Sequence, residues 1–159
     1  MPYSQASLDN RQTSDPTKLS LNLKNRKIRD FVLTQLIPKV QFVLESYRPG
    51  VMERFGLGPD SVHRINPKLI YVRVSGYGHQ HTKLQQQAGR DLNYLAASGM
   101  LSKFRRNADS AAPAFPGNLL TYYAGGSIYT FTLILQALLQ QRQRTVIDCS
   151  LARNMSYTS

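Results

Sequence analysis

The residues best suited to chemistry lie in two neighbouring stretches, and the first of them carries two arginines. Arg48 and Arg54 flank a proline–glycine turn and the start of a predicted short helix. Guanidinium groups pair with phosphate oxygens, and backbone N–H groups at a helix start add further donors. The pattern therefore indicates a site for a phosphorylated ligand. The alternative is a pair of surface arginines, one of them paired with Glu45 or Glu53.

The second stretch, residues 66–78, ends a predicted buried strand with Ser75-Gly76-Tyr77-Gly78. Two glycines at this point would let a ligand approach the backbone closely. An ordinary turn from strand to loop explains the same glycines. The stretch is not a nucleotide-binding glycine-rich loop, because the Lys-Ser/Thr ending of that motif is missing.

The histidines and the cysteine predict neither a metal centre nor a nucleophile. His63, His79 and His81 form no convincing metal set, because His79 and His81 are two residues apart in a polar loop with no cysteine or carboxylate at ligand spacing. We therefore expect solvated histidines and no metal. Cys149 is the single cysteine and lies in an apolar run, which excludes an internal disulfide and indicates a buried thiol in a reducing, intracellular setting.

The charge is strongly positive but evenly spread. The chain has 20 Lys and Arg against 9 Asp and Glu, a net charge of +11, and such an excess favours anionic partners. No basic tail is present, so a solvated surface is the favoured interpretation. Nucleic-acid binding is kept as a third hypothesis, since many of the 9 Tyr and 6 Phe fall in predicted core stretches rather than on a basic face. We expect no nucleic-acid partner.

The elements that must position these residues alternate between strands and helices. Residues 1–17 are a polar leader, predicted to be flexible and without the apolar core of a signal peptide, so no targeting signal is readable. Periodicity predicts strands at 19–23, 40–44, 69–74 and 145–149, and helices at 25–38, 51–55, 59–64, 91–97 and 119–141. This alternation indicates parallel βαβ units in an α/β domain.

The apolar segment 119–139 is the longest in the chain. Tyrosine, glycine, serine, threonine and glutamine residues interrupt it, whereas a membrane span needs about 20 mostly apolar residues. We therefore predict a buried core helix, packed closely through its small residues, and no membrane partner.

The order of the motifs resembles the family III CoA-transferases, and within them the α-methylacyl-CoA racemases. The resemblance is carried by SYRPGVMERFGLGPDSVHRINPKLIYVRVSGYG, AGRDLNYLAASGMLSKF, NLLTYYAGGSIYTFTLILQALL and TVIDCSLARNMSYTS, and it covers about residues 18–159. It implies a parallel-sheet, Rossmann-like large domain that binds acyl-CoA thioesters, with coenzyme A as part of the substrate and no prosthetic group. It further implies an interlocked homodimer and a mitochondrial or peroxisomal location.

The resemblance also implies which residues meet the ligand. The adenosine-phosphate end of CoA would lie along Leu21, Asn22, Arg48, Pro49 and Arg54, and the pantetheine path along Tyr77 and Gly78. The family's first strand would precede residue 18, and its second domain would follow residue 159. We therefore expect residues 18–159 to be a partial CoA-binding domain, incomplete at both ends, for which the homodimer is in doubt.

In the racemases, two bases on opposite faces of the α-carbon exchange its proton, and this chain departs from the family at both matched positions. Arg90 replaces the histidine of Ala-Gly-His-Asp, and Tyr122 replaces an aspartate before an aromatic residue and Ala-Gly-Gly. Arginine stays protonated at neutral pH, and a phenol has an ordinary pKa of about 10. Asp91 is the remaining candidate, but adjacent helical residues point about 100° apart.

Two hypotheses follow from these substitutions. The first is a family enzyme that epimerises 2-methylacyl-CoA through unusual residues. The second is a non-catalytic remnant that binds CoA esters, and a transferase that moves CoA between carboxylic acids is the alternative chemistry. The transferases use the aspartate at the Tyr122 position as a nucleophile, so the same substitution affects both branches. We expect a racemase-like protein that is truncated and catalytically impaired.

Overall fold

The architecture is that of a three-stranded parallel sheet with helices on both faces. The computed structural model describes residues 19–80, 83–105, 112–116 and 120–157. The strands are β1 (Phe42–Glu45), β2 (Ile70–Ser75) and β3 (Val146–Ser150), and β2 pairs in parallel with both neighbours. The α/β class predicted from the alternation of elements is therefore confirmed, over part of the family fold.

One face of the sheet packs on α5 (Tyr129–Gln140). Ile70 and Val72 of β2 alternate toward this helix, where Ile134 and Ala137 meet them in one buried cluster with Cys149. Apolar residues two apart on a strand lie on the same face, and these residues exclude water from the first half of β2. The buried thiol predicted for Cys149 is confirmed, and burial raises the pKa of that thiol.

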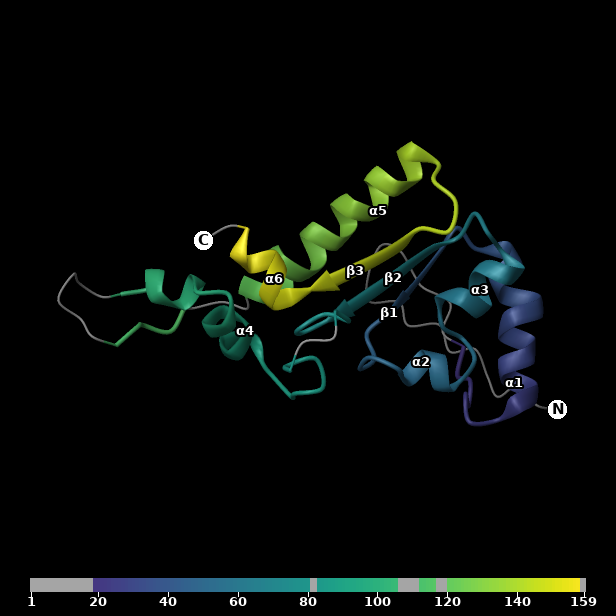
Figure 1. The fold of residues 1–159 in the computed structure, drawn as a ribbon, viewed down its shortest axis with the longest axis horizontal. Coiled ribbons are helices and arrows are strands. Elements are labelled where there is room, and N and C mark those ends of the chain that lie inside the picture. Colours follow the sequence, from purple (N-terminus) through teal and green to yellow (C-terminus); the bar gives the residue numbers. More distant parts are fainter. Residues whose placement is uncertain (1–18, 81–82, 106–111, 117–119, 158–159) are drawn as a thin grey trace.

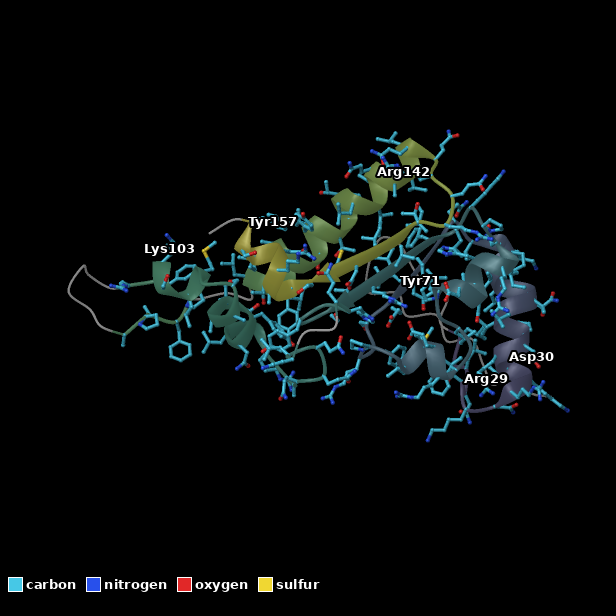
Figure 2. All side chains as sticks on the ribbon, viewed as in Figure 1. Arg29, Asp30, Tyr71, Lys103, Arg142 and Tyr157 are labelled. Atoms are coloured by element: carbon cyan, nitrogen blue, oxygen red, sulfur yellow. The ribbon has the colours of Figure 1, made fainter. Side chains whose placement is uncertain are left out.

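The opposite face is covered by helices that flank β1 in sequence. Tyr71 and Leu69 pack with Val62 of α3 (Pro59–Ile65) and with Ile37. The buried Tyr71 hydroxyl donates to the backbone carbonyl of Leu57 at 2.9 Å, so its polar end is satisfied. Figure 1 shows α5 on one side of the strands and α3 on the other. Figure 2 places Tyr71 in the interior, whereas Asp30 and Arg142 lie at the edges.

The chain before and after β1 consists of short helical segments. They are α1 (Arg26–Phe31), the π-helix η1 (Val32–Leu36), the 3-10 helix η2 (Ile37–Lys39) and α2 (Val51–Arg54). The side chain of Asn25 caps α1 by accepting the Lys27 N–H at 3.0 Å. The predicted helices at 25–38, 51–55 and 59–64 are thus confirmed.

A second group of helices gathers beyond the carboxyl ends of the strands, at the edge that Figure 1 shows beside α4 and α6. These are α4 (Asp91–Ala97), the 3-10 helix η3 (Met100–Lys103), the π-helix η4 (Thr121–Ile128) and α6 (Leu151–Ser156). α6 lies so close to η4 that a Cβ atom at Gly126 would approach Leu151 Cδ2 to 2.8 Å. The Asn154 side chain donates to the Gly125 carbonyl at 2.7 Å, which closes this contact.

Two predictions about the elements were wrong, and one element was missed. Residues 19–23 form no strand: the Asn22 side chain accepts the Lys24 N–H at 3.0 Å in a turn that leads into α1, and such local bonds compete with sheet pairing. The predicted helix at 119–141 is confirmed over the described residues 120–140, where it starts as the π-helix η4. Its predicted burial was wrong, because Phe131, Leu135 and Leu139 of α5 are exposed. The helix α6 was not predicted.

The polar leader 1–17 lies outside the described residues. Within the described part of the chain, no helix combines the length and apolar character needed to cross a bilayer.

Candidate functional site

Two adjoining cavities open at the carboxyl edge of the sheet. The first, which we name the polar cavity, has a volume of about 310 Å³. Its walls come from residues 46–49 after β1, residues 75–77 at the end of β2 and residues 87–90 before α4. Arg48 and Arg90 are among the described lining residues, and no carboxylate is. The polar cavity is therefore suited to an anionic ligand.

The second cavity, which we name the apolar cavity, has a volume of about 630 Å³. β1 contributes Phe42 and Leu44, and the helices contribute Tyr122, Phe131 and Ile134. Both cavities are lined by Ser46, Ser75, Gly76 and Tyr94. The two cavities therefore adjoin each other across a shared wall, and we name them together the cleft, polar at one end and apolar at the other.

Tyr94 of α4 stands where the two cavities meet. Its ring makes edge-to-face contacts with Tyr77, at 5.1 Å between ring centroids, and with Tyr122, at 6.2 Å. Its hydroxyl donates to the Gly89 carbonyl at 2.8 Å. Burial, with smaller contributions from Tyr122 and Tyr77, raises the pKa of Tyr94. The Tyr94 hydroxyl is thus uncharged at neutral pH, and it forms part of the wall of the cleft.

The packing of Tyr94 explains Gly76. A Cβ atom at position 76 would overlap the Tyr94 ring. The sequence left open whether this glycine admits a ligand or makes an ordinary turn. The structure shows a third reason, because the space above Gly76 is filled by a tyrosine of the same chain.

The residues predicted to bind CoA divide into two groups. Arg48, Pro49 and Tyr77 line the polar cavity, and the Gln86 side chain donates to the Pro49 carbonyl at 3.2 Å, which ties the two loops together. Gly78 lines a neighbouring cavity of about 270 Å³.

The remaining predicted contacts lie elsewhere. Arg54 is not among the described residues that line either cavity, although a Cβ atom at Gly50 would lie 3.8 Å from Arg54 Nη1. Leu21 and Asn22 precede α1 and are likewise outside the described lining of both cavities. The structure therefore brings together the arginine, proline and tyrosine part of the predicted site.

The two positions that match the family bases face the cleft from different elements. Arg90 is exposed and lines the polar cavity as the residue before α4, where its N–H donates to the Asn93 side chain at 2.9 Å. Tyr122 lies on η4 and lines the apolar cavity. The cleft thus presents a guanidinium and a phenol at these positions, neither of which is a base near neutral pH.

The Asp91 side chain accepts hydrogen bonds that hold two helices of the fold together. The side chain is buried, and Oδ1 accepts the N–H of Thr121 at 2.8 Å, the N–H of Tyr122 at 3.2 Å and the Thr121 hydroxyl. The carboxylate therefore joins the start of α4 to the start of η4, and Asp91 is outside the described lining of both cavities.

Two histidines lie away from the cleft. The ring of His63 is buried and its Nε2 is 3.0 Å from the Leu69 carbonyl. His79 is half-buried, and burial lowers the pKa of its ring, with Arg73 acting in the same direction. The prediction of solvated histidines was wrong for both. His81 lies outside the described residues, and the described residues contain no group of three or more His, Cys, Asp or Glu that could hold a metal.

Sequence reasoning missed Tyr94 and a row of charges, Glu45, Arg73 and Asp148, that crosses the sheet at one level. A signal for the row was present, since Arg73 and Asp148 are single charges within apolar strand patterns. No such signal for Tyr94 was present in the sequence, because its contacts with Gly76 and Gly89 depend on the tertiary fold.

Comparison with known proteins gives one consistent result. Residues 15–159 match the model of CoA-transferase family III. The human alpha-methylacyl-CoA racemase is 42% identical over 132 residues, which are 80% of this chain and 34% of that protein. The succinyl-CoA--D-citramalate CoA-transferase of Chloroflexus aurantiacus is 35% identical over 116 residues, 72% of this chain and 27% of that protein.

A crystal structure of a CAIB/BAIF family protein from Brucella suis superimposes with a TM-score of 0.74 at 25% sequence identity. It covers 86% of this chain and 36% of that one. The chain spans about a third of the length of the curated relatives it matches.

Proposed function

Because the chain belongs to CoA-transferase family III, we propose that its cleft binds acyl-CoA thioesters. The CoA portion occupies the polar cavity, and the acyl group extends into the apolar cavity. The observation that carries this proposal is that the polar and the apolar cavity adjoin each other and share the wall residues Ser46, Ser75, Gly76 and Tyr94. A CoA thioester is a single molecule with phosphates at one end and an acyl chain at the other, which fits such a cleft.

The chemistry we propose is that of the racemase branch, with proton transfer impaired. Racemisation needs groups that take and give protons near neutral pH. Position 90 carries a guanidinium and position 122 a phenol, where the resemblance implies an imidazole and a carboxylate. Asp91 cannot replace them without giving up three hydrogen bonds. The protein is therefore a racemase-like binder of acyl-CoA, and positions 90 and 122 do not supply the two general bases that racemisation needs.

One observation favours the racemase branch over the transferase branch. Identity is 42% with the racemase relative and 35% with the transferase relative. The substitution at Tyr122 does not separate the branches, because a phenol replaces neither a base of the racemases nor the nucleophilic carboxylate of the transferases.

Calorimetric titration with CoA tests the binding. We expect Arg48→Ala to raise the Kd by roughly 10- to 100-fold, the effect of losing one charge-assisted hydrogen bond. Arg54→Ala should cost less, because Arg54 is outside the described lining of the cleft. Arg64→Ala is the matched control, since Arg64 lies exposed on α3 and its guanidinium donates within that helix.

Two results would reject this assignment. One is the absence of any binding heat with the unaltered chain at millimolar CoA. The other is an equal loss of affinity in Arg48→Ala and Arg64→Ala, which would indicate general charge attraction rather than a site.

A further inference from the structure

Three charged residues form a row beneath the cleft. Glu45 of β1 pairs in register with Arg73 of β2, and Arg73 pairs in register with Asp148 of β3. Residues in register on adjacent strands project from the same face of a sheet. We name Glu45, Arg73 and Asp148 the charged row. In order across the sheet, the row is an acid, a cation and an acid. Glu45 ends β1, whereas Arg73 and Asp148 each lie two residues before the end of their strand.

Arg73 is the cation at the centre of the row. Its guanidinium forms an ion pair with Glu53 of α2, and its Nε lies 4.0 Å from Glu45 Oε1. The guanidinium also lies 5.5 Å from the centre of the Tyr71 ring, in cation–π contact. The Arg73 side chain is 14% exposed and is outside the described lining of both cavities. Any effect of Arg73 on a ligand must therefore pass through its neighbours.

Each acid of the row holds a loop of the cleft. Glu45 Oε2 accepts the N–H of Tyr47 at 2.7 Å, and Asp148 Oδ2 accepts the N–H of His79 at 2.9 Å. Tyr47 lines the polar cavity, and so does Tyr77, two residues before His79. The two carboxylates are thus anchors for the loop after β1 and the loop after β2.

These anchors need a nearby positive charge. Glu45 is 5% exposed, and a buried carboxylate is costly unless it is paired and hydrogen-bonded. Burial raises the pKa of Glu45, whereas Arg73 and the Tyr47 N–H act in the opposite direction. Arg73 Nε and Asp148 Oδ1 are buried without a hydrogen-bond partner among the described residues. Each acid of the row therefore accepts one backbone N–H, and Arg73 supplies the positive charge that lies between them in register.

We propose that Arg73 is a positioning residue for CoA binding, acting through Glu45 and Asp148 on the loops at Tyr47 and His79. This inference rests on the proposed function, because it names a residue that shapes the same cleft. It assigns Arg73 no contact with the ligand. Its effect is to hold the two carboxylates in place by its positive charge, so that the two loops hold the walls of the polar cavity.

The test compares Arg73→Gln with Arg73→Lys in the full chain, with Arg64→Gln as the matched control. Amide hydrogen exchange by NMR reports on the loops, and calorimetry with CoA reports on the site. We expect Arg73→Gln to increase exchange at the Tyr47 and His79 amides more than at Val72 or Val62, and to raise the CoA Kd roughly tenfold. Arg73→Lys keeps the charge and should stay within about threefold of the unaltered chain.

The outcomes separate this inference from the proposed function. Unchanged exchange at Tyr47 and His79 overturns it, and so does a uniform rise in exchange that includes Val72 and Val62. If the unaltered chain does not bind CoA, the proposed function fails, while the exchange data still decide whether Arg73 holds the loops.

A second pair of variants covers the case in which Arg73→Gln does not fold. In Glu45→Gln the amide oxygen can still accept the Tyr47 N–H, whereas Glu45→Met removes the acceptor at similar size. We expect protection of the Tyr47 amide and CoA affinity to be kept in Glu45→Gln and reduced in Glu45→Met. Equal behaviour of the two variants would overturn the inference.

Discussion

The loops after β1 and β2 differ from the α4–η4 region in what their side chains can do. In the loops, Arg48, Pro49 and Tyr77 line the polar cavity with the residue types expected of a CoA site. In the α4–η4 region, Arg90 and Tyr122 line the cleft at the positions that we predicted to match the family's two bases. Both regions face the same cleft, but only the first has side chains suited to its expected task.

The frame of the α4–η4 region is nevertheless complete. Asp91 joins α4 to η4 through three hydrogen bonds, and Asn154 of α6 donates to η4 at Gly125. None of these contacts requires the family's histidine or aspartate. In this comparison, the contacts that hold the α4–η4 region together use other residues than the two positions that we predicted to match the family's bases.

The largest effect is expected at the junction of the two regions. In Gly76→Val the new side chain would overlap the Tyr94 ring, and we expect the free energy of unfolding to fall by about 3 kcal/mol or more. Urea unfolding followed by circular dichroism measures this. The double variant Gly76→Val/Tyr94→Ala should lose less than the sum of the single losses, because the clash is absent. Additive losses would show that the two regions do not meet through these residues.

Asp91 tests whether the frame and the chemistry are separate. In Asp91→Ala the N–H groups of Thr121 and Tyr122 lose their acceptor, and we expect a loss of about 2–3 kcal/mol in the free energy of unfolding. Asp91→Asn should lose less, since an amide oxygen can still accept. Asp30→Ala, at an exposed position of α1, is the control. A loss in Asp91→Ala as small as in Asp30→Ala would mean that Asp91 is free for another role.

The smallest effect concerns the loop region and its pH dependence. Burial lowers the pKa of His79 in the folded chain below the ordinary value of 6.5. At a pH between the two pKa values, the ring is therefore protonated in the unfolded chain and neutral in the folded chain. The free energy of unfolding should therefore decrease as the pH falls through 6.5. The decrease should be shallower in His79→Gln, measured by chemical denaturation from pH 8 to pH 5.5. Parallel profiles for the two proteins would contradict the burial of this ring.

Local patterns predicted most of the elements that carry the site. The β-branched and apolar run at Ile70–Val74 predicted β2, Asn25 predicted the start of α1, and Pro59 predicted the start of α3. These signals act within a few residues, so they can be recognised without the tertiary fold. The alternating leucines at 19–23 were misleading, because turn bonds of Asn22 and the cap at Asn25 compete with a strand.

The parts that could not be predicted depend on distant contacts. The position of Tyr94 over Gly76 joins α4 to the end of β2, and the charged row requires the register of three strands. No local sequence pattern predicts either the contact of Tyr94 with Gly76 or the alignment of the charged row. The exposure of Phe131 and Leu135 on α5 could not be predicted for the same reason. The sequence of a helix that is apolar on several sides does not indicate which side the rest of the fold covers.

Deuterium uptake at the α-carbon of a 2-methylacyl-CoA, with the ester at a concentration that saturates the cleft, tests the central claim most directly. If the cleft holds the thioester and positions 90 and 122 supply no base, the α-hydrogen will exchange no faster than in buffer. Exchange at an enzyme-like rate by the unaltered chain would contradict this account.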